Sequence, residues 1–184
     1  VGKDLLLKRL DELFTIEMDE NIPGAHDIQG RIGAYWHGNE PCHHIAFLYN
    51  QLGQPWKCQK WIRTIASHFY GDEPGSLSGN DDCGQMSAWY IFACMGFYPV
   101  APSSNVYSIG SPCVKAMKLK LSNGKMIEMI ADNWSSRNIY VKELYVNGKK
   151  HTSSYLKYDD VCNGVKLRFV MSGKPNYKRG LDSN

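Results

Sequence analysis

The feature that most constrains the fold is a change of pattern near residues 99–112. Before this point apolar residues recur every three or four positions, which predicts helices, and after it come short strand-like runs separated by turn residues. We expect helices at residues 4–14, 41–51, 55–69 and 84–95. Because helices precede strands instead of alternating with them, the predicted class is α+β with segregated parts, a helical segment at residues 1–98 and an antiparallel β region at residues 99–184.

Two Asn-Gly dipeptides predict hairpin turns in the β region. Asn123 and Gly124 separate "AMKLKLS" from "KMIEMIAD", and Asn147 and Gly148 follow "NIYVKELYV". Asn-Gly is a strong hairpin signal because both residues tolerate the positive φ angles of a tight turn. The run "GVKLRFVM" is expected to form the last strand.

Composition and charge narrow the classes of protein and partner. With 184 residues, of which 43% are hydrophobic and 21% charged, the chain can bury a core. The formal net charge is +3 and the basic residues are spread along the chain, so nucleic acid is not expected as a partner. The sequence has no run of 18 apolar residues, so no membrane span is predicted. The N-terminal "VGKDLLLKRLDELF" is typical of an amphipathic helix and not of a signal peptide, and without an initial Met we expect a mature or partial protein.

The predicted helix at residues 84–95 is apolar on nearly every side. Such a helix needs neighbours all around it, and the three other predicted helices can hardly provide them. We therefore expect the helical part to belong to a larger helical assembly. A four-helix bundle covered by the sheet is the alternative.

The six cysteines form no recognisable metal or disulfide pattern. They lie far apart without a C-x-x-C pair, which indicates isolated buried thiols. A zinc site at Cys42, His43 and His44 is disfavoured, because ligands adjacent in sequence seldom converge on one ion. A nucleophilic pair of Cys42 or Cys83 with a histidine lacks any local signature.

Two polar segments lie just ahead of predicted helices. In "GAYWHGNEPCHHI" Asn39 suits an N-cap with proline in the first turn, and in "GNDDCGQ" Asp82 suits an N-cap with Gln85 at the capping-box spacing. One cap per helix does not explain so many polar residues. Carboxylates at helix N-termini stay ionised and oriented, so they can bind calcium or serve as a base that activates water. Tyr35 and Trp36 in the first segment are expected to be exposed for stacking on a ligand.

Long motifs in this order resemble one family. "HGNEPCHHIAFLYNQLGQPWKCQKWIR", "GDEPGSLSGNDDCGQMSAWYIFACMGFYPV" and "YSIGSP", followed by "LSNGK", "NIYVKELYVNGK" and "FVMSGKPN", are similar to the C-terminal part of the α-mannosidases of glycoside hydrolase family 92. The resemblance covers nearly the whole chain. It implies calcium-dependent exo-hydrolysis of α-mannosides, often α-1,2-linked, with inversion at the anomeric carbon. It also implies that the helices end an (α/α)6 barrel and that the strands join a β-sandwich domain.

The resemblance also implies roles for individual residues. Asp82 matches the general base of the family, which deprotonates the attacking water. Asn80 matches a position that is often a second Asp, and as an amide it can orient water but cannot share the base role. Asn39 and Glu40 match residues at the calcium ion and the bound sugar, and we expect them to be metal ligands.

Three further residues are expected to support the site. His37, His43 and Gln85 lie in the same motifs, and the resemblance implies contacts with sugar hydroxyls or support of the residues that make them.

A general acid is not found in this sequence. An inverting glycosidase needs an acid and a base with carboxyl groups roughly 6.5–9.5 Å apart. The acid of the family is a Glu upstream of the first residue here, and Glu12, Glu17 and Glu20 lie in the wrong context. We therefore predict that this chain alone does not hydrolyse mannosides.

The expected partners are mannose-containing glycans, such as N-glycans, and the remaining N-terminal part of the same enzyme. By resemblance, the parent protein is expected to be periplasmic or secreted. The alternative function is a non-catalytic carbohydrate-binding or structural module derived from the same fold.

Overall fold

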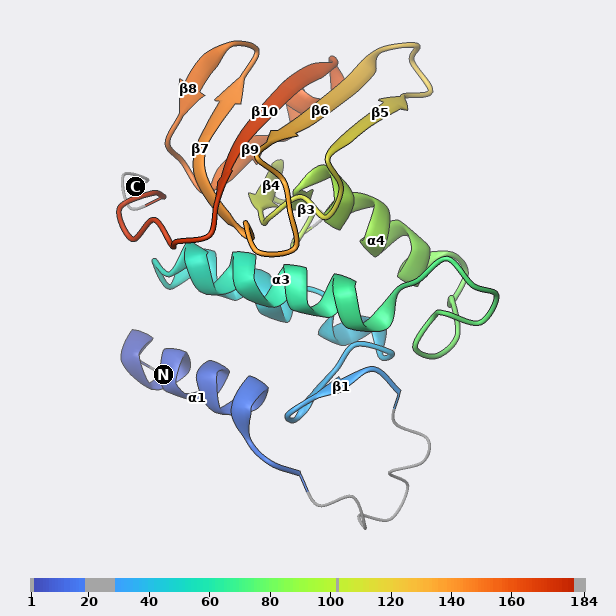
Figure 1. Cartoon of the computed structure of the whole chain (residues 1–184), viewed down its shortest axis with the longest axis vertical. Coiled ribbons are helices and arrows are strands. Elements are labelled where there is room, and N and C mark those ends of the chain that lie inside the picture. The colour runs from blue at the N-terminus through green and yellow to red at the C-terminus, as the bar shows by residue number, and fades with distance from the viewer. Residues whose placement is uncertain (1, 19–28, 102, 181–184) are drawn as a thin grey trace.

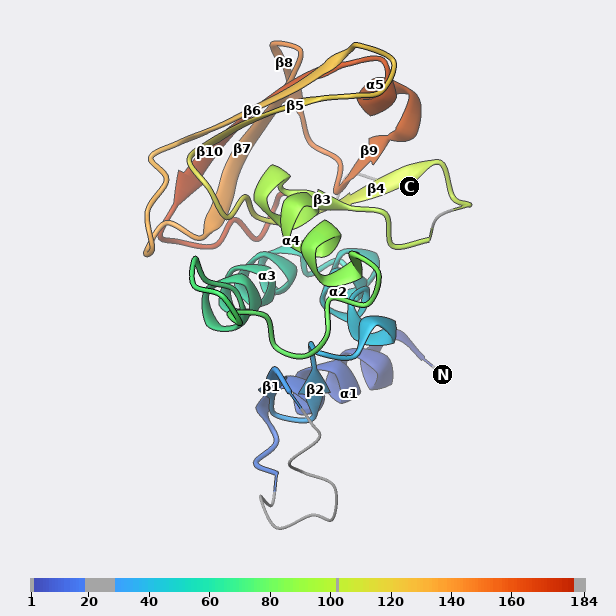
Figure 2. The same ribbon diagram turned by 90° about the vertical axis from the view of Figure 1, so that its right-hand side faces the viewer.

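The structure is a computed structural model, and it describes residues 2–18, 29–101 and 103–180. The elements form layers, which Figures 1 and 2 show from two sides. A five-stranded sheet lies at one end, and α4 (Gln85–Met95) with a small sheet lies beneath it. Next come α2 (Leu48–Gln51) and α3 (Pro55–Phe69), and α1 (Lys3–Thr15) with a short hairpin lies at the far end. Most helices and strands are thus segregated, as the sequence predicts. The exceptions are β1 (Arg31–Ile32), β2 (Tyr35–Trp36) and β3 (Phe97–Tyr98) in the helical segment and α5 (Tyr158–Cys162) in the β region.

Three of the four predicted helices are confirmed within one residue at each end. The helical elements are α1 (Lys3–Thr15), η2 (Glu40–Cys42), η3 (Ile45–Phe47), α2 (Leu48–Gln51), α3 (Pro55–Phe69), α4 (Gln85–Met95) and α5 (Tyr158–Cys162).

The helix predicted at residues 41–51 is wrong in part, because two 3-10 turns replace its first half. Cys42 N donates to Asn39 O over 2.9 Å and Phe47 N to His44 O over 3.0 Å, which are i to i+3 bonds. The carbonyl oxygen of His43 instead accepts a bond of 3.1 Å from the indole Nε1 of Trp89. A tertiary contact thus occupies a carbonyl group that a continuous α-helix would use.

The strands form three sheets. In the largest sheet the order is β5-β6-β10-β7-β8, the second is β3-β4-β9, and the third pairs β1 with β2. The strands are β1 (Arg31–Ile32), β2 (Tyr35–Trp36), β3 (Phe97–Tyr98), β4 (Val106–Ile109), β5 (Ala116–Lys120), β6 (Met126–Asp132), β7 (Tyr140–Val146), β8 (Lys149–His151), β9 (Tyr155–Lys157) and β10 (Val165–Ser172).

One strand pair departs from the predicted antiparallel arrangement. β10 lies between β6 and β7, antiparallel to β7 but parallel to β6, with Val165 opposite Ile127 and Phe169 opposite Ala131. The other pairs are antiparallel. β10 alternates buried and more exposed residues, so its apolar side chains fill the centre of the sheet.

Both Asn-Gly hairpins are confirmed. The first turn joins β5 to β6 and the second joins β7 to β8, each as an antiparallel pair. In the second turn Asn147 has φ 49° and Gly148 φ 81°, which is the pair of positive angles that a two-residue hairpin turn requires.

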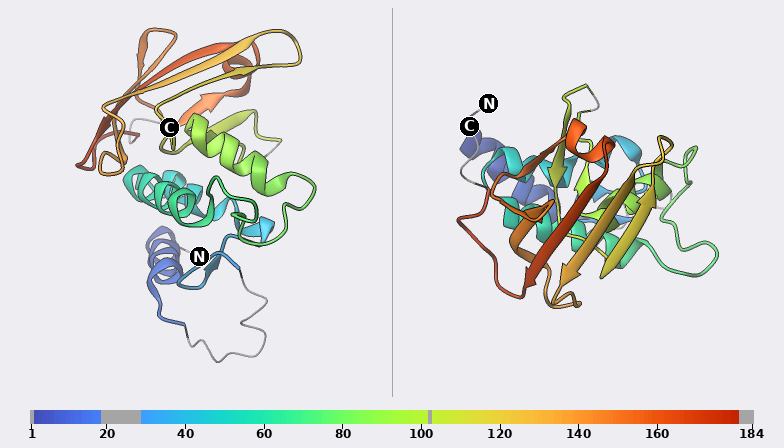
Figure 3. Two further views of the ribbon diagram at one scale, coloured as in Figure 1. Left: turned by 45° about the vertical axis from the view of Figure 1, so that its right-hand side comes forward. Right: turned by 90° about the horizontal axis from the view of Figure 1, so that it is seen from above.

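Two hydrophobic cores meet at α4. Trp89 and Ala93 pack into the helical core, whereas Met95 packs into the core beneath the large sheet. Figure 3 shows α4 between these two parts. Ile91 on the same helix is 41% exposed, so α4 is not covered on all sides by this chain.

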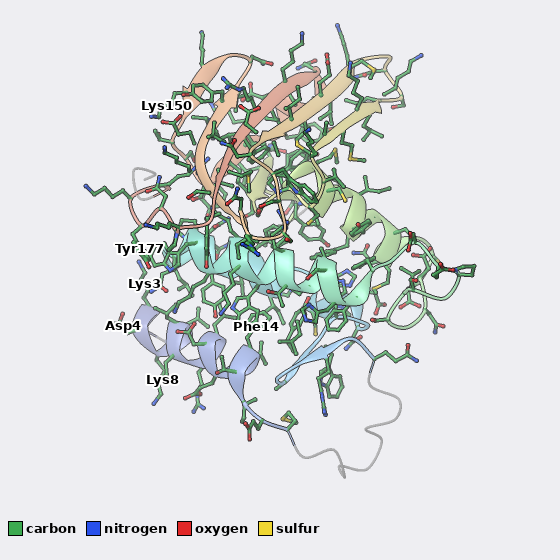
Figure 4. The ribbon with its side chains drawn as sticks, in the orientation of Figure 1. Lys3, Asp4, Lys8, Phe14, Lys150 and Tyr177 are labelled. Carbon is green, nitrogen blue, oxygen red and sulfur yellow. The ribbon has the colours of Figure 1, made fainter. Side chains whose placement is uncertain are left out.

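The helix α1 packs through a narrow face. Leu10 and Phe14 are buried, whereas Leu6 is 40% exposed. Phe14 points from α1 towards α3 (Figure 4), where its ring stacks on Trp61 at 4.5 Å between centroids.

All six cysteines are free, but only Cys58 and Cys94 are buried, and Cys83 is exposed. The expectation of buried thiols is thus correct for two of the six. In the described ranges no helix has both the length and the apolar character that crossing a membrane requires.

Candidate active site

Three of the predicted site residues line one small polar cavity. Its volume is about 170 Å³, and Asn39, Asn80 and Asp82 lie on its wall. Asn39 comes just before η2, and the other two come from the loop that leads into α4. The remaining lining residues are Gln29, Trp36, Gly38 and Gly79.

Glycine allows the loops around this cavity to approach closely. A β-carbon on Gly38 would overlap the carbonyl oxygen of Ser78. Backbone bonds also hold residues 37 and 38 against residues 29 and 30, from His37 N to Gly30 O at 2.7 Å and from Gly38 N to Gln29 O at 3.2 Å. A side chain at position 38 would therefore push the loop bearing Asn80 and Asp82 away from the loop bearing Asn39.

The two neighbouring aspartates have different positions, and the predicted cap is wrong. Gly84 is the N-cap residue of α4 and makes no side-chain cap bond. The carboxylate of Asp81, not that of Asp82, accepts bonds from the backbone N and the hydroxyl of Ser87 at 2.9 and 2.8 Å. Asp82 is exposed at the cavity. Gln85 is the first residue of the helix and bonds elsewhere, so no capping box forms.

Asn39 occupies the predicted N-cap position of a short helix but does not cap it. Its side chain makes no cap bond to η2 and is exposed at the cavity. Glu40 is half-buried in η2. Burial lowers the pKa of His43, and the carboxylates of Glu40 and Asp82 act in the opposite direction, which places both negative charges near this ring.

His37 lies behind the cavity wall and not in the cavity. Its side chain is fully buried, and the hydroxyls of Tyr35 and Tyr70 lie 2.8 Å from Nδ1 and 2.6 Å from Nε2. Tyr70 donates its proton to Met86 O at 3.1 Å, so Nε2 of His37 donates to Tyr70 and Nδ1 accepts from Tyr35. Burial, with a smaller effect of His43, lowers the pKa of His37 to about 3. A sugar hydroxyl has no free ring nitrogen to bind here, so support is the role that the structure leaves to His37.

His43 and Gln85 form a second chain of hydrogen bonds behind the cavity. Nε2 of His43 donates to the His37 carbonyl oxygen at 3.0 Å, and its Nδ1 accepts from Gln85 Nε2 at 3.0 Å. Gln85 also donates to the hydroxyl of Tyr98 at 3.2 Å. His43 is buried and Gln85 is half-buried, so these side chains fix the first turn of α4 against the loop at residues 37–43.

The expected exposure of the aromatic pair is wrong for Tyr35 and only partly met by Trp36. Trp36 is half-buried and lines the cavity, whereas Tyr35 is 1% exposed and packs on Phe14 at 4.9 Å between ring centroids. Sequence reasoning missed Gln29 and Tyr70. Neither lies in a polar segment or at a periodic position, so the sequence carried no signal for them.

The lining residues offer oxygen donors of the kind that calcium prefers. Asn39, Asn80, Asp82 and Gln29 can each present a carbonyl or carboxylate oxygen. Calcium takes roughly six to eight oxygen ligands, so this set fits part of such a site. No group of three or more His, Cys, Asp or Glu side chains that could hold a metal occurs in the described part of the chain. The donor chemistry thus fits calcium provided that further oxygens complete the shell.

The sequence of nearly the whole chain matches a known catalytic domain. The family model described as the glycosyl hydrolase family 92 catalytic domain matches residues 1–173. The chain belongs to glycosyl hydrolase family 92. The resemblance of the motifs is therefore confirmed.

Members of family 92 with solved structures share this fold. A family GH92 α-mannosidase from Bacteroides thetaiotaomicron, in complex with mannoimidazole, is 74% identical with a TM-score of 0.95 over 98% of this chain. A family GH92 inverting mannosidase from the same organism is 34% identical with a TM-score of 0.79 over 97% of this chain. The chain covers 24% and 25% of these two proteins.

A curated relative is also longer than this chain. It is described as an uncharacterized secreted glycosidase of Arthroderma benhamiae and is 32% identical over 150 residues. The match covers 80% of this chain and 19% of the relative. The chain thus spans about a quarter or less of the relatives that it matches.

Proposed function

We propose that this chain contributes the general base and part of the calcium site of an inverting exo-α-mannosidase that acts on α-1,2-linked mannosides. The observation that carries the proposal is the cavity in which Asp82, Asn80 and Asn39 meet. The family 92 α-mannosidase that is 74% identical to this chain has the same fold, which supports the same chemistry for these residues.

Asp82 is proposed to take the proton of the attacking water. Its carboxylate is exposed at the cavity, where water has access, and among the residues that the structure describes it is the one carboxylate on the cavity wall. The Asn80 amide would orient this water, because an amide offers both a donor and an acceptor but cannot take a proton. His43 and Gln85 would hold α4 and the loop of Asn39 in register through their mutual bond.

Asn39 and Glu40 are proposed to hold calcium, with further oxygens from other parts of the longer protein. These residues would hold the ion beside the bound sugar, where its charge would help to stabilise the oxocarbenium-like transition state. Trp36 on the cavity wall would offer an apolar face to the sugar ring.

The general acid is proposed to come from outside this chain. Glu12 lies on α1 and pairs with Arg9 at 3.1 Å and with Lys8 at 3.9 Å, and it does not line the cavity. Glu17 does not line it either, and Glu20 lies outside the described residues. The rest of the parent enzyme would supply the acid opposite Asp82, at the separation that inversion needs.

The larger architecture follows from the same proposal. Residues 1–98 would complete an (α/α)6 barrel, and residues 99–184 would belong to a β-sandwich domain. The uncovered side of α4 at Ile91 supports a helical neighbour outside this chain. Mannose-containing glycans would be the substrates, and a periplasmic or secreted location is supported by the secreted glycosidase among the relatives.

The decisive experiment compares the full-length enzyme with its Asp82→Asn variant on α-1,2-mannobiose. We expect a loss of kcat of about 10²–10⁴-fold, because an amide cannot act as base. NMR of the first product formed would show β-mannose if the reaction inverts. Unchanged activity of the variant, or α-mannose as first product, would contradict the proposal.

A further inference from the structure

The two aspartates ahead of α4 are held very differently. Asp81 is fixed by four bonds: its carboxylate accepts from Ser87 N and Oγ, and its carbonyl oxygen accepts from Gly84 N and Met86 N at 3.2 Å each. The carboxylate of Asp82 has no hydrogen-bond or ion-pair partner among the residues that the structure describes. The first residue is therefore part of the helix end, and the second is free to act in the cavity.

The backbone between Asp81 and the helix has an uncommon conformation. Three successive residues, Asp82, Cys83 and Gly84, have φ values of 46°, 58° and 94°. Residues other than glycine rarely adopt such angles, and two in a row persist only where the surroundings impose them. This turn directs the side chain of Asp82 to the cavity.

Bonds at both ends of the turn impose this conformation. Before the turn, the four bonds to Asp81 fasten it to the first turn of α4. After it, Gln85 N donates to Asp82 O at 3.2 Å. Because the carboxylate of Asp81 binds two groups of Ser87, it ties the residue before the turn to the third residue of the helix.

We propose that Asp81 is the positioning residue of this site: its bonds to Ser87 hold the left-handed turn at residues 82–84 and so aim the carboxylate of Asp82 at the attacking water. The inference rests on the proposed role of Asp82 as base. It assigns Asp81 a role through hydrogen bonding, not through its charge.

Two substitutions separate hydrogen bonding from charge. In Asp81→Asn the amide oxygen can still accept both bonds from Ser87, whereas Asp81→Ala removes the acceptor. In the full-length enzyme we expect Asp81→Ala to lower kcat by about 10²-fold with little change of KM, because a base displaced by about 1 Å loses that much rate. Asp81→Asn should restore kcat to within about threefold of the unchanged enzyme.

A third substitution strains the turn without touching Asp81. A β-carbon on Gly84 would meet nothing within 4 Å, so Gly84→Ala introduces strain at φ 94° without a steric clash. We expect it to lower kcat in the same way as Asp81→Ala, with KM retained.

Asp81→Ala also weakens a helix end, so a control variant must show that lost stability by itself does not lower kcat. Asn147 accepts from Lys166 N at 2.9 Å and has φ 49° in the turn between β7 and β8. Asn147→Ala should lower Tm while kcat, measured well below Tm, stays unchanged.

The outcomes are distinguishable. Full kcat in Asp81→Ala overturns the positioning role, and equal losses in Asp81→Ala and Asp81→Asn overturn the hydrogen-bond mechanism. An active Asp82→Asn variant overturns the proposed function itself. Inactive Asp82→Asn together with fully active Asp81→Ala overturns this inference alone.

Discussion

At the scale of single residues, Asp81 and Asp82 show how two identical side chains acquire different roles. The carboxylate of Asp81 binds the end of α4, and that of Asp82 faces a polar cavity. Asp81 thus accepts the hydrogen bonds that the N-terminal end of α4 needs, and the carboxylate of Asp82 does not have to accept them.

The first prediction at this scale concerns His37 and pH. Because burial lowers its pKa to about 3, the folded protein holds His37 neutral, and the unfolded chain binds a proton near the ordinary pKa of about 6.5. This contribution to stability is complete above pH of about 6.5 and is lost progressively as the pH falls towards 3, by an amount on the order of a few kcal/mol. Urea unfolding at a series of pH values measures it.

The matched variant for this prediction is His37→Gln. An amide keeps a donor and an acceptor for Tyr35 and Tyr70 but does not titrate in this range. Its free energy of unfolding should be lower at pH 7 and should fall less steeply on acidification. Identical pH dependence in both proteins would contradict the assignment.

The second prediction concerns calcium. If Glu40 is a ligand as proposed, Glu40→Gln removes one negative charge from the site and should weaken calcium binding to the full-length enzyme by about tenfold or more, because affinity follows ligand charge. Titration calorimetry measures this. Glu143→Gln is the control, since Glu143 pairs with Lys150 at 2.9 Å on the edge hairpin of the sheet and should not change calcium affinity.

At the scale of elements, the contact between α4 and the loop before α2 decides the local conformation. Trp89 donates to the carbonyl oxygen of His43, and its ring lies 4.3 Å from that of His37. We expect Trp89→Phe to cost about 1–3 kcal/mol of unfolding free energy, because it leaves a buried carbonyl group without a partner.

The control for this element is Trp56→Phe. Trp56 makes an edge contact with the exposed Tyr177 at 4.9 Å and is only half-buried. Chemical denaturation of both variants should show a clearly larger loss for Trp89→Phe. Equal losses would mean that the indole bond to His43 contributes little.

At the scale of the whole molecule, the chain contains part of a site and part of a core. In the described ranges one carboxylate lines the cavity, and Ile91 on the apolar α4 is 41% exposed. We predict that the purified chain does not hydrolyse α-1,2-mannobiose, whereas the full-length enzyme does so in a calcium-dependent manner. Clear calcium-dependent turnover by the chain alone would show that it contains its own acid.

Ile91→Lys tests whether another helix covers α4 in the full-length enzyme. In the isolated chain this residue is 41% exposed, so the substitution should change stability by less than about 0.5 kcal/mol. In the full-length enzyme a buried unpaired ammonium group should lower Tm markedly. Equal, small effects in both proteins would contradict a barrel helix at this position.

The sequence by itself determined the order of helices and strands, the bounds of α3, both Asn-Gly hairpins and the motifs of the family. These features depend on the spacing of apolar residues, on the φ preferences of Asn and Gly and on stretches of residues shared with the family. All of these can be found in the sequence itself. The placement of Asn39, Asn80 and Asp82 on one cavity agrees with their presence in those motifs. Their catalytic roles stay predictions.

The tertiary structure alone decided the parallel pairing of β6 with β10, the 3-10 turns before α2, the burial of His37 and the cap by Asp81. Each depends on atoms far apart in sequence or on a backbone turn that the spacing of apolar residues does not predict. β10 enters the sheet beside a strand more than thirty residues earlier, and Trp89 binds a carbonyl group 46 residues earlier. Local patterns specify which elements form, and long-range contacts specify which of their polar groups remain available for chemistry.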